Sequence, residues 1–132
     1  MQKVTVKSFQ NNSIYEDVLA VIQADKEFST SKLPWKETFK DNQDRECASF
    51  QVQVHYDIVV KEKTLRETMF TQIVCKEGVL DKAEKLKLKP GDCIKFTGKY
   101  SVRKGHVRWF PKFEILHPDF IEKVKSLPTD AI

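Results

Sequence analysis

Several residue types that mark whole protein classes are scarce in this sequence. Its 132 residues include only four Gly and five Pro, which excludes collagen-like and low-complexity chains. The three cysteines, Cys47, Cys75 and Cys93, are an odd number and lie far apart. They exclude a disulfide framework as the main design and suit a reducing compartment. We therefore expect an intracellular protein, in the cytoplasm or nucleoid if bacterial or phage and in the nucleus if eukaryotic.

Long apolar segments are also missing. No apolar run approaches the roughly 18 residues that a membrane span needs. The N-terminal residues, MQKVTVKSFQ, alternate charged and apolar side chains and lack the apolar segment of a signal peptide. The sequence therefore predicts no membrane partner.

The signatures of common catalytic and metal sites do not occur. There is no Gly-rich phosphate loop, no HExxH and no GxSxG, and the Cys and His residues show neither CxxC nor HxxxH spacing. Asp41, Asp44 and Glu46 could be imagined as a nuclease metal site, but a solvated acidic loop is the simpler interpretation. We expect a protein that is not an enzyme and that has no cofactor and no metal site.

The sequence does contain enough apolar material for one domain. Apolar residues make up 40% of the chain, and fourteen residues are aromatic: nine Phe, three Tyr and two Trp. Wholesale disorder is therefore excluded, and one compact core is expected at this length.

Positive charge is concentrated in one stretch. The net charge is only +4, but residues 82–112 hold ten Lys or Arg against Glu84 and Asp92, which gives +8. The rest of the chain holds thirteen basic and seventeen acidic residues, which gives −4. This asymmetry indicates one basic surface and an anionic partner, with a solvated lysine-rich face as the alternative.

Alternation of apolar and polar residues predicts that most of the chain forms strands. The segment 48–60 is the clearest case, with Phe50, Val52 and Val54 on one face. The segment 14–25 also fits a helix, but we favour a strand. The expected strands cover residues 3–9, 14–25, 48–60, 64–75, 92–102 and 106–116.

Two helices and one long loop complete the prediction. A short helix over residues 79–87 is stopped by Pro90-Gly91. A terminal helix over residues 117–127 has an apolar stripe and ends at Pro128. The apolar stripe of this terminal helix consists of Phe120, Ile121, Val124 and Leu127.

The polar segment from Glu27 to Glu46 is predicted to be a long loop, and loops of that length are usually functional or disordered.

The order of these elements predicts an all-β fold with short helices. Three strands, a helix and a closing hairpin are the order of the five-stranded OB-fold, a Greek-key barrel with its helix between strands 3 and 4. We expect residues 1–116 to form the barrel. Residues 117–132 are expected to form a helix and tail that pack on the same domain or on a partner. Such barrels bind oligonucleotides between two loops, here Glu27–Glu46 and Ser101–His106.

Three segments carry a resemblance to a known family. MQKVTV, ASFQVQV and the run from Phe70 to Leu116 resemble the bacterial and phage single-stranded-DNA-binding proteins. The shared features are an N-terminal strand, a hairpin, a helix ending in Lys89-Pro90-Gly91-Asp92, a strand with the pattern Ile94-Lys95-Phe96-Thr97-Gly98, a basic hairpin and a closing strand. The likeness is good over residues 48–116 and poor over the first 47.

The chain departs from that family at three places. Met69 and Phe70 occupy the stretch of the third strand where the family stacks bases on an aromatic ring. Gly105 stands where the family favours Trp after the basic pair. The chain ends SLPTDAI without the family's acidic tip. The expected terminal helix instead resembles small subunits of eukaryotic single-strand-binding and telomere-end complexes, which assemble through that helix.

Single-strand binding requires cations for phosphates and flat side chains for bases. Trp109 and Tyr100 share the parity of apolar neighbours, so a core position is the alternative for both. Trp35 could equally cover a barrel mouth, and His55 could be an ordinary surface residue. The candidate nucleic-acid contacts are Trp35, Phe39, His55, Lys95, Lys99, Tyr100, Arg103, Lys104, His106, Arg108, Trp109 and Lys112.

Two functions are compatible with these residues. The first is non-enzymatic binding of single-stranded DNA with low sequence specificity, in replication, recombination, repair or end protection. The second is an assembly subunit whose terminal stripe, Phe120, Ile121, Val124 and Leu127, binds a partner. RNA binding by the same face is a weaker alternative. We expect a homo-oligomer or a hetero-complex with other nucleic-acid-processing proteins, and a homodimer and a homotetramer remain alternatives.

Overall fold

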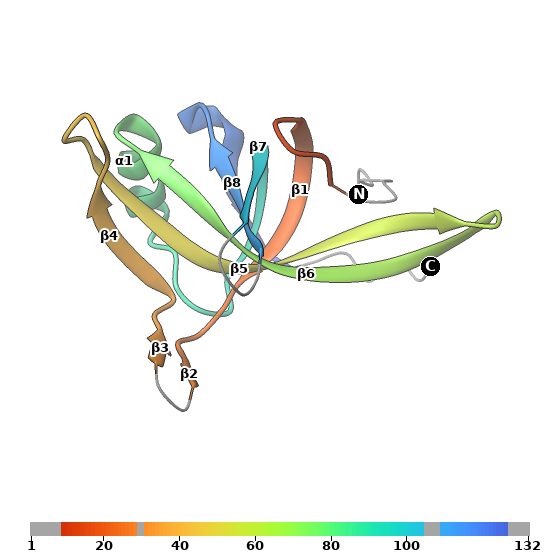
Figure 1. Cartoon of the computed structure of the whole chain (residues 1–132). Helices are drawn as coiled ribbons and strands as arrows, with labels where there is room; N and C mark the ends of the chain where they lie inside the picture. Colours follow the sequence, from red (N-terminus) through yellow and green to blue (C-terminus); the bar gives the residue numbers. More distant parts are fainter. Residues whose placement is uncertain (1–8, 29–30, 105–108, 127–132) are drawn as a thin grey trace.

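The structure is a computed structural model and describes residues 9–28, 31–104 and 109–126 (Figure 1). Strands dominate this part of the chain. In sequence order they are β1 (Ile14–Ile22), β2 (Lys26–Phe28), β3 (Ser31–Leu33), β4 (Lys36–Lys40), β5 (Glu46–Val60), β6 (Lys63–Lys76), β7 (Cys93–Lys104), β8 (Trp109–Ile115) and β9 (Ile121–Val124). The helices described are α1 (Gly78–Leu86) and the 3₁₀ turn η1 (Pro118–Phe120).

Five of the strands close into a barrel. The neighbours around it are β1, β5, β6, β8 and β7, and β7 pairs with β1 again. All of these pairs are antiparallel except β6 and β8, which run parallel. Helix α1 lies between β6 and β7 in sequence. This is the OB-fold topology, so the predicted fold is confirmed.

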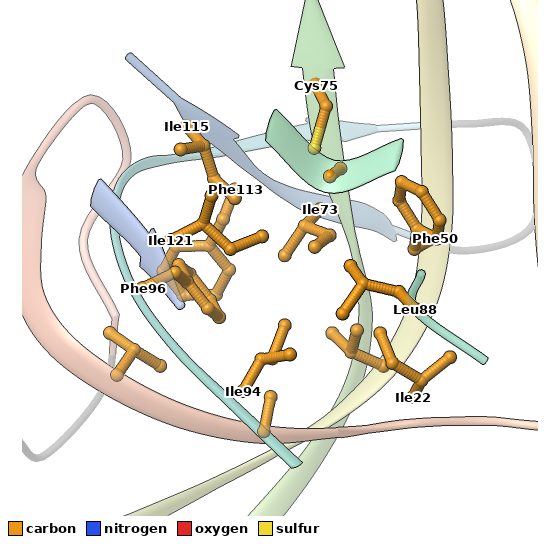
Figure 2. Packing of buried hydrophobic residues seen from close by; sticks show 14 of the residues in the cluster. Ile22, Phe50, Ile73, Cys75, Leu88, Ile94, Phe96, Phe113, Ile115 and Ile121 are labelled. Atoms are coloured by element: carbon orange, nitrogen blue, oxygen red, sulfur yellow. The ribbon is translucent and has the colours of Figure 1, made fainter. Parts of the chain in front are cut away.

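The core lies inside the barrel and follows from strand alternation. On β5, Phe50, Val52 and Val54 are buried while Gln51 and Gln53 are only partly covered, as a half-buried strand requires. The other strands contribute Ile73, Ile94, Phe96, Phe113 and Ile115, which meet in the barrel interior (Figure 2). Burial of large side chains of this kind stabilises the fold by about 1.5–3 kcal/mol each.

Gly98 allows β7 and β8 to approach closely. A Cβ at this position would stand 3.1 Å from the carbonyl oxygen of Glu114. Gly98 pairs with Ile115 on β8 and with Tyr15 on β1. A register shift follows on β1 between Tyr15 and Val18, and such a bulge helps a sheet to curve into a barrel.

The prediction that the segment from Glu27 to Glu46 is a loop is wrong, because the segment contains strands. It contains β3 and β4 and most of β2, where β2 pairs with β3 as a small hairpin and β4 adds to the edge of β5. The residues of β4 read KETFK, and alternation cannot reveal such a strand because neither of its faces is strongly apolar. The segment is therefore an ordered extension of the barrel.

The predicted terminal helix is also wrong. Residues 118–120 form η1, and residues 121–124 form β9, which pairs antiparallel with β7. His117 caps η1 by accepting a hydrogen bond on Nδ1 from the main-chain N–H of Asp119 (3.0 Å). Ile121 is buried in the core beside Phe96 and Phe113 (Figure 2). Burial of this one side chain outweighs the weak helical pattern around it.

The first predicted strand, residues 3–9, lies almost wholly outside the described residues. Phe9 is described, and its ring packs on aromatic residues at the end of the barrel. The ring centroids are 4.8 Å from Tyr15, 4.9 Å from Tyr56, 5.4 Å from Tyr100 and 5.4 Å from Phe113.

Strands β5 and β6 continue beyond the barrel as a two-stranded arm, which we define as residues 56–68 (Figure 1). The pairing of β5 with β1 extends along β5 as far as His55, and the pairing of β6 with β8 begins at Gln72. The hairpin predicted at this place is confirmed. Its turn residues, Lys61 and Glu62, both have positive φ angles of 50° and 66°, which suits a two-residue hairpin turn.

Candidate nucleic-acid interface

A polar row crosses the outside of the barrel. Gln51 on β5 lies opposite Gln72 on β6, Gln72 opposite Lys112 on β8, and Lys112 opposite Ser101 on β7. Residues that are opposite each other in a sheet point to the same side. We call this surface the glutamine face, and it consists of Gln51, Gln53, Phe70, Gln72, Lys99, Ser101, Arg103 and Lys112.

Phe70 is the exposed aromatic residue of the glutamine face. It lies opposite Gln53, and 55% of its side chain is exposed. Its neighbour Met69 turns inward against the core. The Lys26 ammonium, from β2, lies 3.6 Å from the centroid of the Phe70 ring. This cation–π contact holds a positive charge directly beside a flat apolar surface.

A shallow groove connects Phe70 with the β2–β3 hairpin. Its lining includes Gln23, Lys26, Leu33, Gln51 and Phe70, and its free volume is about 30 Å³. That volume holds about one water molecule. The groove is therefore too small to enclose a small-molecule ligand, and the chemistry of this region lies on an open surface.

Three predicted cations belong to the glutamine face. Lys99 and Arg103 are exposed and share the outward parity of Ser101 on β7, and Lys112 is exposed on β8. Glu114 lies opposite Lys99 and 3.6 Å from the Lys76 ammonium, so it offsets part of the positive charge at this edge. The face nevertheless combines an aromatic ring, amide side chains and cations.

Lys95 does not join these cations. Its ammonium forms an ion pair of 3.0 Å with Glu122 of β9, and the hydrogen bond with Glu122 raises the pKa of Lys95. It lines a separate groove of about 410 Å³ together with Glu16, Asp17 and Asp119. Negative charge surrounds Lys95, which makes it a poor phosphate contact.

Two of the predicted aromatic contacts serve the core. Tyr100 is only 7% exposed, and its ring lies 5.1 Å from that of Phe113, so it cannot stack on a base. Trp35 is half-buried and packs against Phe50 at 6.0 Å. Its main-chain N–H donates to Oδ1 of Asp25 (2.8 Å). Both residues stabilise the barrel and its first connecting segment.

Phe39 is exposed but lies away from the glutamine face. It sits on β4 opposite Cys47, six residues along β5 from Gln53, which is about 20 Å at the rise of a strand. It lines a groove of about 420 Å³ with Leu80 and Asp81 of α1. The structure therefore does not bring Phe39 to the glutamine face.

His55 lies next to that face, opposite Thr68. It is half-buried, and burial together with the charge of Arg66 lowers its pKa. It is therefore a neutral hydrogen-bonding group at pH 7. Of the remaining predicted contacts, His106 and Arg108 lie outside the described residues, and only the backbone of Lys104 and Trp109 is described.

The predicted partner stripe does not exist as one surface. Phe120 is 41% exposed, whereas Ile121 is buried in the core and Val124 is half-buried. Leu127 lies outside the described residues. Phe120 ends η1 and is exposed, whereas Ile121 begins β9 and packs in the core, so the two side chains do not form one partner surface.

Sequence reasoning missed Phe70, Lys26 and the glutamine pair Gln51 and Gln72 as candidate contacts. The parity of β6 could have identified Phe70, because Gln72 and Thr68 are two residues away and polar. The contact between Lys26 and Phe70 could not have been predicted, because it depends on the hairpin of β2 and β3 that the sequence presents as a loop.

Within the described ranges, His, Cys, Asp and Glu side chains form no group of three that could hold a metal ion. The helices in the same ranges are too short or too polar to cross a bilayer.

The topology defines the chain as an OB-fold protein. Comparison with protein families and with curated proteins found no match. Among solved structures, the fold is similar to a small single-stranded DNA-binding protein from Streptomyces coelicolor, with a TM-score of 0.55, 15% identity, and coverage of 89% of this chain and 96% of that one. It is also similar to the Plasmodium falciparum SSB in complex with ssDNA, with a TM-score of 0.53, 12% identity, and coverage of 90% and 96%. The predicted resemblance is confirmed at the level of the fold.

Proposed function

We propose that the chain binds single-stranded DNA across the glutamine face, with low sequence specificity and without a chemical step. The observation that carries the proposal is Phe70, an exposed aromatic ring in the middle of a polar sheet face with a lysine ammonium beside it. A large exposed aromatic residue normally marks an interaction site when cations and amides surround it. The likeness to two solved single-stranded DNA-binding proteins supports the same interpretation.

Each component has a defined role in this proposal. A base stacks on the free side of the Phe70 ring, and this is worth about 1–3 kcal/mol whatever the base is. Lys26, Lys112 and Arg103 bind phosphates on either side of that base. Gln51 and Gln72 can donate to and accept from base edges, since amide side chains do both. Stacking requires an unpaired base, which favours single strands over a duplex.

The proposed cellular roles are those of a protein that covers exposed single strands: replication, recombination, repair or end protection. RNA is the alternative ligand, because stacking and phosphate contacts do not exclude a ribose. The alternative of an assembly subunit acting through the C-terminal stripe loses support, because Ile121 is a core residue.

The test is fluorescence anisotropy with labelled oligo-dT on the wild type and two variants. Phe70→Ala should raise the Kd about 5- to 150-fold, the loss of one stacked base. Phe120→Ala is the matched control, because it removes an exposed ring that lies beside the acidic groove and not on the glutamine face, and it should leave the Kd unchanged. Equal affinity of Phe70→Ala and wild type would refute the proposed site.

A further inference from the structure

The arm carries exposed apolar side chains on one of its faces. Ile58 lies opposite Leu65, and Val60 lies opposite Lys63, so these residues share a side. Val60 is 45% exposed and Leu65 is 44% exposed. A two-stranded hairpin is only marginally stable in water unless further strands or a packing surface cover it. The arm therefore has a surface that a partner would stabilise.

The outer edge of β6 is also open within the described residues. In the arm, β6 pairs with β5 on one side, and its pairing with β8 on the other side covers only residues 72–74. An exposed edge of this kind is a template for another strand. A partner that adds a strand here would form main-chain hydrogen bonds with this edge and place its own side chains beside Leu65 on the apolar face.

The sequence of this edge is complementary to itself. Lys63 and Glu67 each lie two residues from Leu65 and have opposite charges. If two copies of β6 pair antiparallel with Leu65 on the two-fold axis, Lys63 of each copy lies opposite Glu67 of the other. The same register places Leu65 opposite Leu65 and Thr64 opposite Arg66. A two-fold interface must be self-complementary in this way.

We propose that the chain forms a two-fold dimer by antiparallel pairing of the outer edges of β6 over Lys63–Glu67, centred on Leu65. The result is a four-stranded sheet made from two arms. Its apolar face contains Ile58, Val60 and Leu65 from each copy. Two Lys63–Glu67 pairs flank the axis and fix the register, because a shift by one residue places each charge on the opposite face from its partner.

The edge of β5 is less suited to this role. Asp57 lies on it, is buried, and forms an ion pair with Arg66 (3.6 Å between Oδ1 and Nε). Asp57 is the one charged side chain of β5 in the arm, so the edge of β5 has no pair of opposite charges comparable with Lys63 and Glu67. The arm also has no Phe or Trp, and its one aromatic residue, Tyr56, packs against Phe9. A protein partner therefore fits this surface better than the bases of a nucleic acid.

The experiment is a charge swap read by sedimentation equilibrium. The wild type should have about twice the chain mass of 15.4 kDa. Lys63→Glu and Glu67→Lys each create two like-charge pairs in the dimer and should raise the dissociation constant about tenfold. The double variant Lys63→Glu/Glu67→Lys should restore the dimer, because opposite charges again face each other. Lys85→Glu on α1 is the control for net charge and should change nothing.

Four results would overturn the proposal. The first is a wild type that stays monomeric. The second is a dimer whose dissociation constant does not respond to either single variant. The third is a weakened dimer that the double variant does not restore, because rescue requires the two side chains to be opposite each other. If the single variants weaken oligo-dT binding at unchanged mass, the arm is a nucleic-acid element and the proposal is wrong.

A cross-link tests the register independently of dimer strength. Opposite residues of an antiparallel pair have Cα atoms about 4.5–5.5 Å apart, which is within the range of a disulfide. Leu65→Cys should therefore give a covalent dimer on mild oxidation. Lys61→Cys is the control, because its two copies would be about 26 Å apart in this register. Equal cross-linking of both variants, or of neither, contradicts the pairing.

Discussion

At the scale of single residues, Phe70 shows how the fold turns an apolar side chain into a binding group. Its neighbours in sequence, Met69 and Thr71, are covered, whereas Phe70 points outward between Gln53 and the Lys26 ammonium. Exposure of a Phe side chain gives up the burial energy of about 2 kcal/mol that it would gain in a core. That cost is recovered when a base covers the ring.

The three thiols differ in a way that can be measured. Burial, with a smaller contribution from Glu84, raises the pKa of Cys75 to about 12. Cys47 is also buried, whereas Cys93 is half-buried. At pH 8 a thiol reagent should therefore modify Cys93 in the native protein and leave Cys75 protonated and untouched, since the thiolate is the reactive form.

The measurement is a count of modified thiols with and without guanidinium. We expect one reactive thiol in the native state and all three in the unfolded state. Native Cys75 that reacts as fast as Cys93 would contradict the packing of β6 against the core.

At the scale of elements, the C-terminal segment is where the sequence predicted a helix and the structure has the turn η1 and the strand β9. In a helix, Phe120, Ile121 and Val124 would share one apolar stripe. In the structure, Ile121 begins β9 and is buried in the barrel, whereas Phe120 ends η1 and is exposed. The two arrangements predict different stabilities for single variants.

Ile121→Ala should lower the free energy of unfolding by about 2–5 kcal/mol, because it leaves a cavity in a packed core. Phe120→Ala should change it by less than about 0.5 kcal/mol, as an exposed substitution does. Urea denaturation of both variants measures this. Similar losses for the two would favour a helix with a shared stripe.

The five strands of the barrel were predicted well from the sequence, whereas the short strands β4 and β9, which pair with β5 and β7, were not. β5 and β6 have clean alternation because each covers the core with one face. β4 and β9 were missed because both strands are short. β4 (KETFK) is mostly polar, β9 (IEKV) spans only four residues, and pairing with β5 and β7 reveals them. The same reason explains why Lys26 was missed, since a contact between a hairpin and the outer face is purely tertiary.

At the scale of the whole molecule, the protein has a mild net charge of +4 but an uneven surface. Lys99, Arg103 and Lys112 lie with Phe70 on the glutamine face, whereas Glu16, Asp17, Asp119 and Glu122 line the groove beside Lys95 and Thr97 of β7. A nucleic acid would be attracted to the first surface and repelled from the second. The barrel thus presents two faces with opposite electrostatic preferences.

Single-strand binding across the glutamine face is tested most directly by the affinity for oligo-dT at several salt concentrations, compared with that for a duplex of equal length. The phosphate contacts Lys26, Arg103 and Lys112, with Lys99 as a fourth cation of the glutamine face, are each worth about −0.7 on single strands and predict a slope of log K against log salt of about −2 to −3. We expect that slope for oligo-dT and much weaker binding of the duplex. Absence of binding at low salt, or equal binding of duplex and single strand, would show that the glutamine face is not a single-strand binding site.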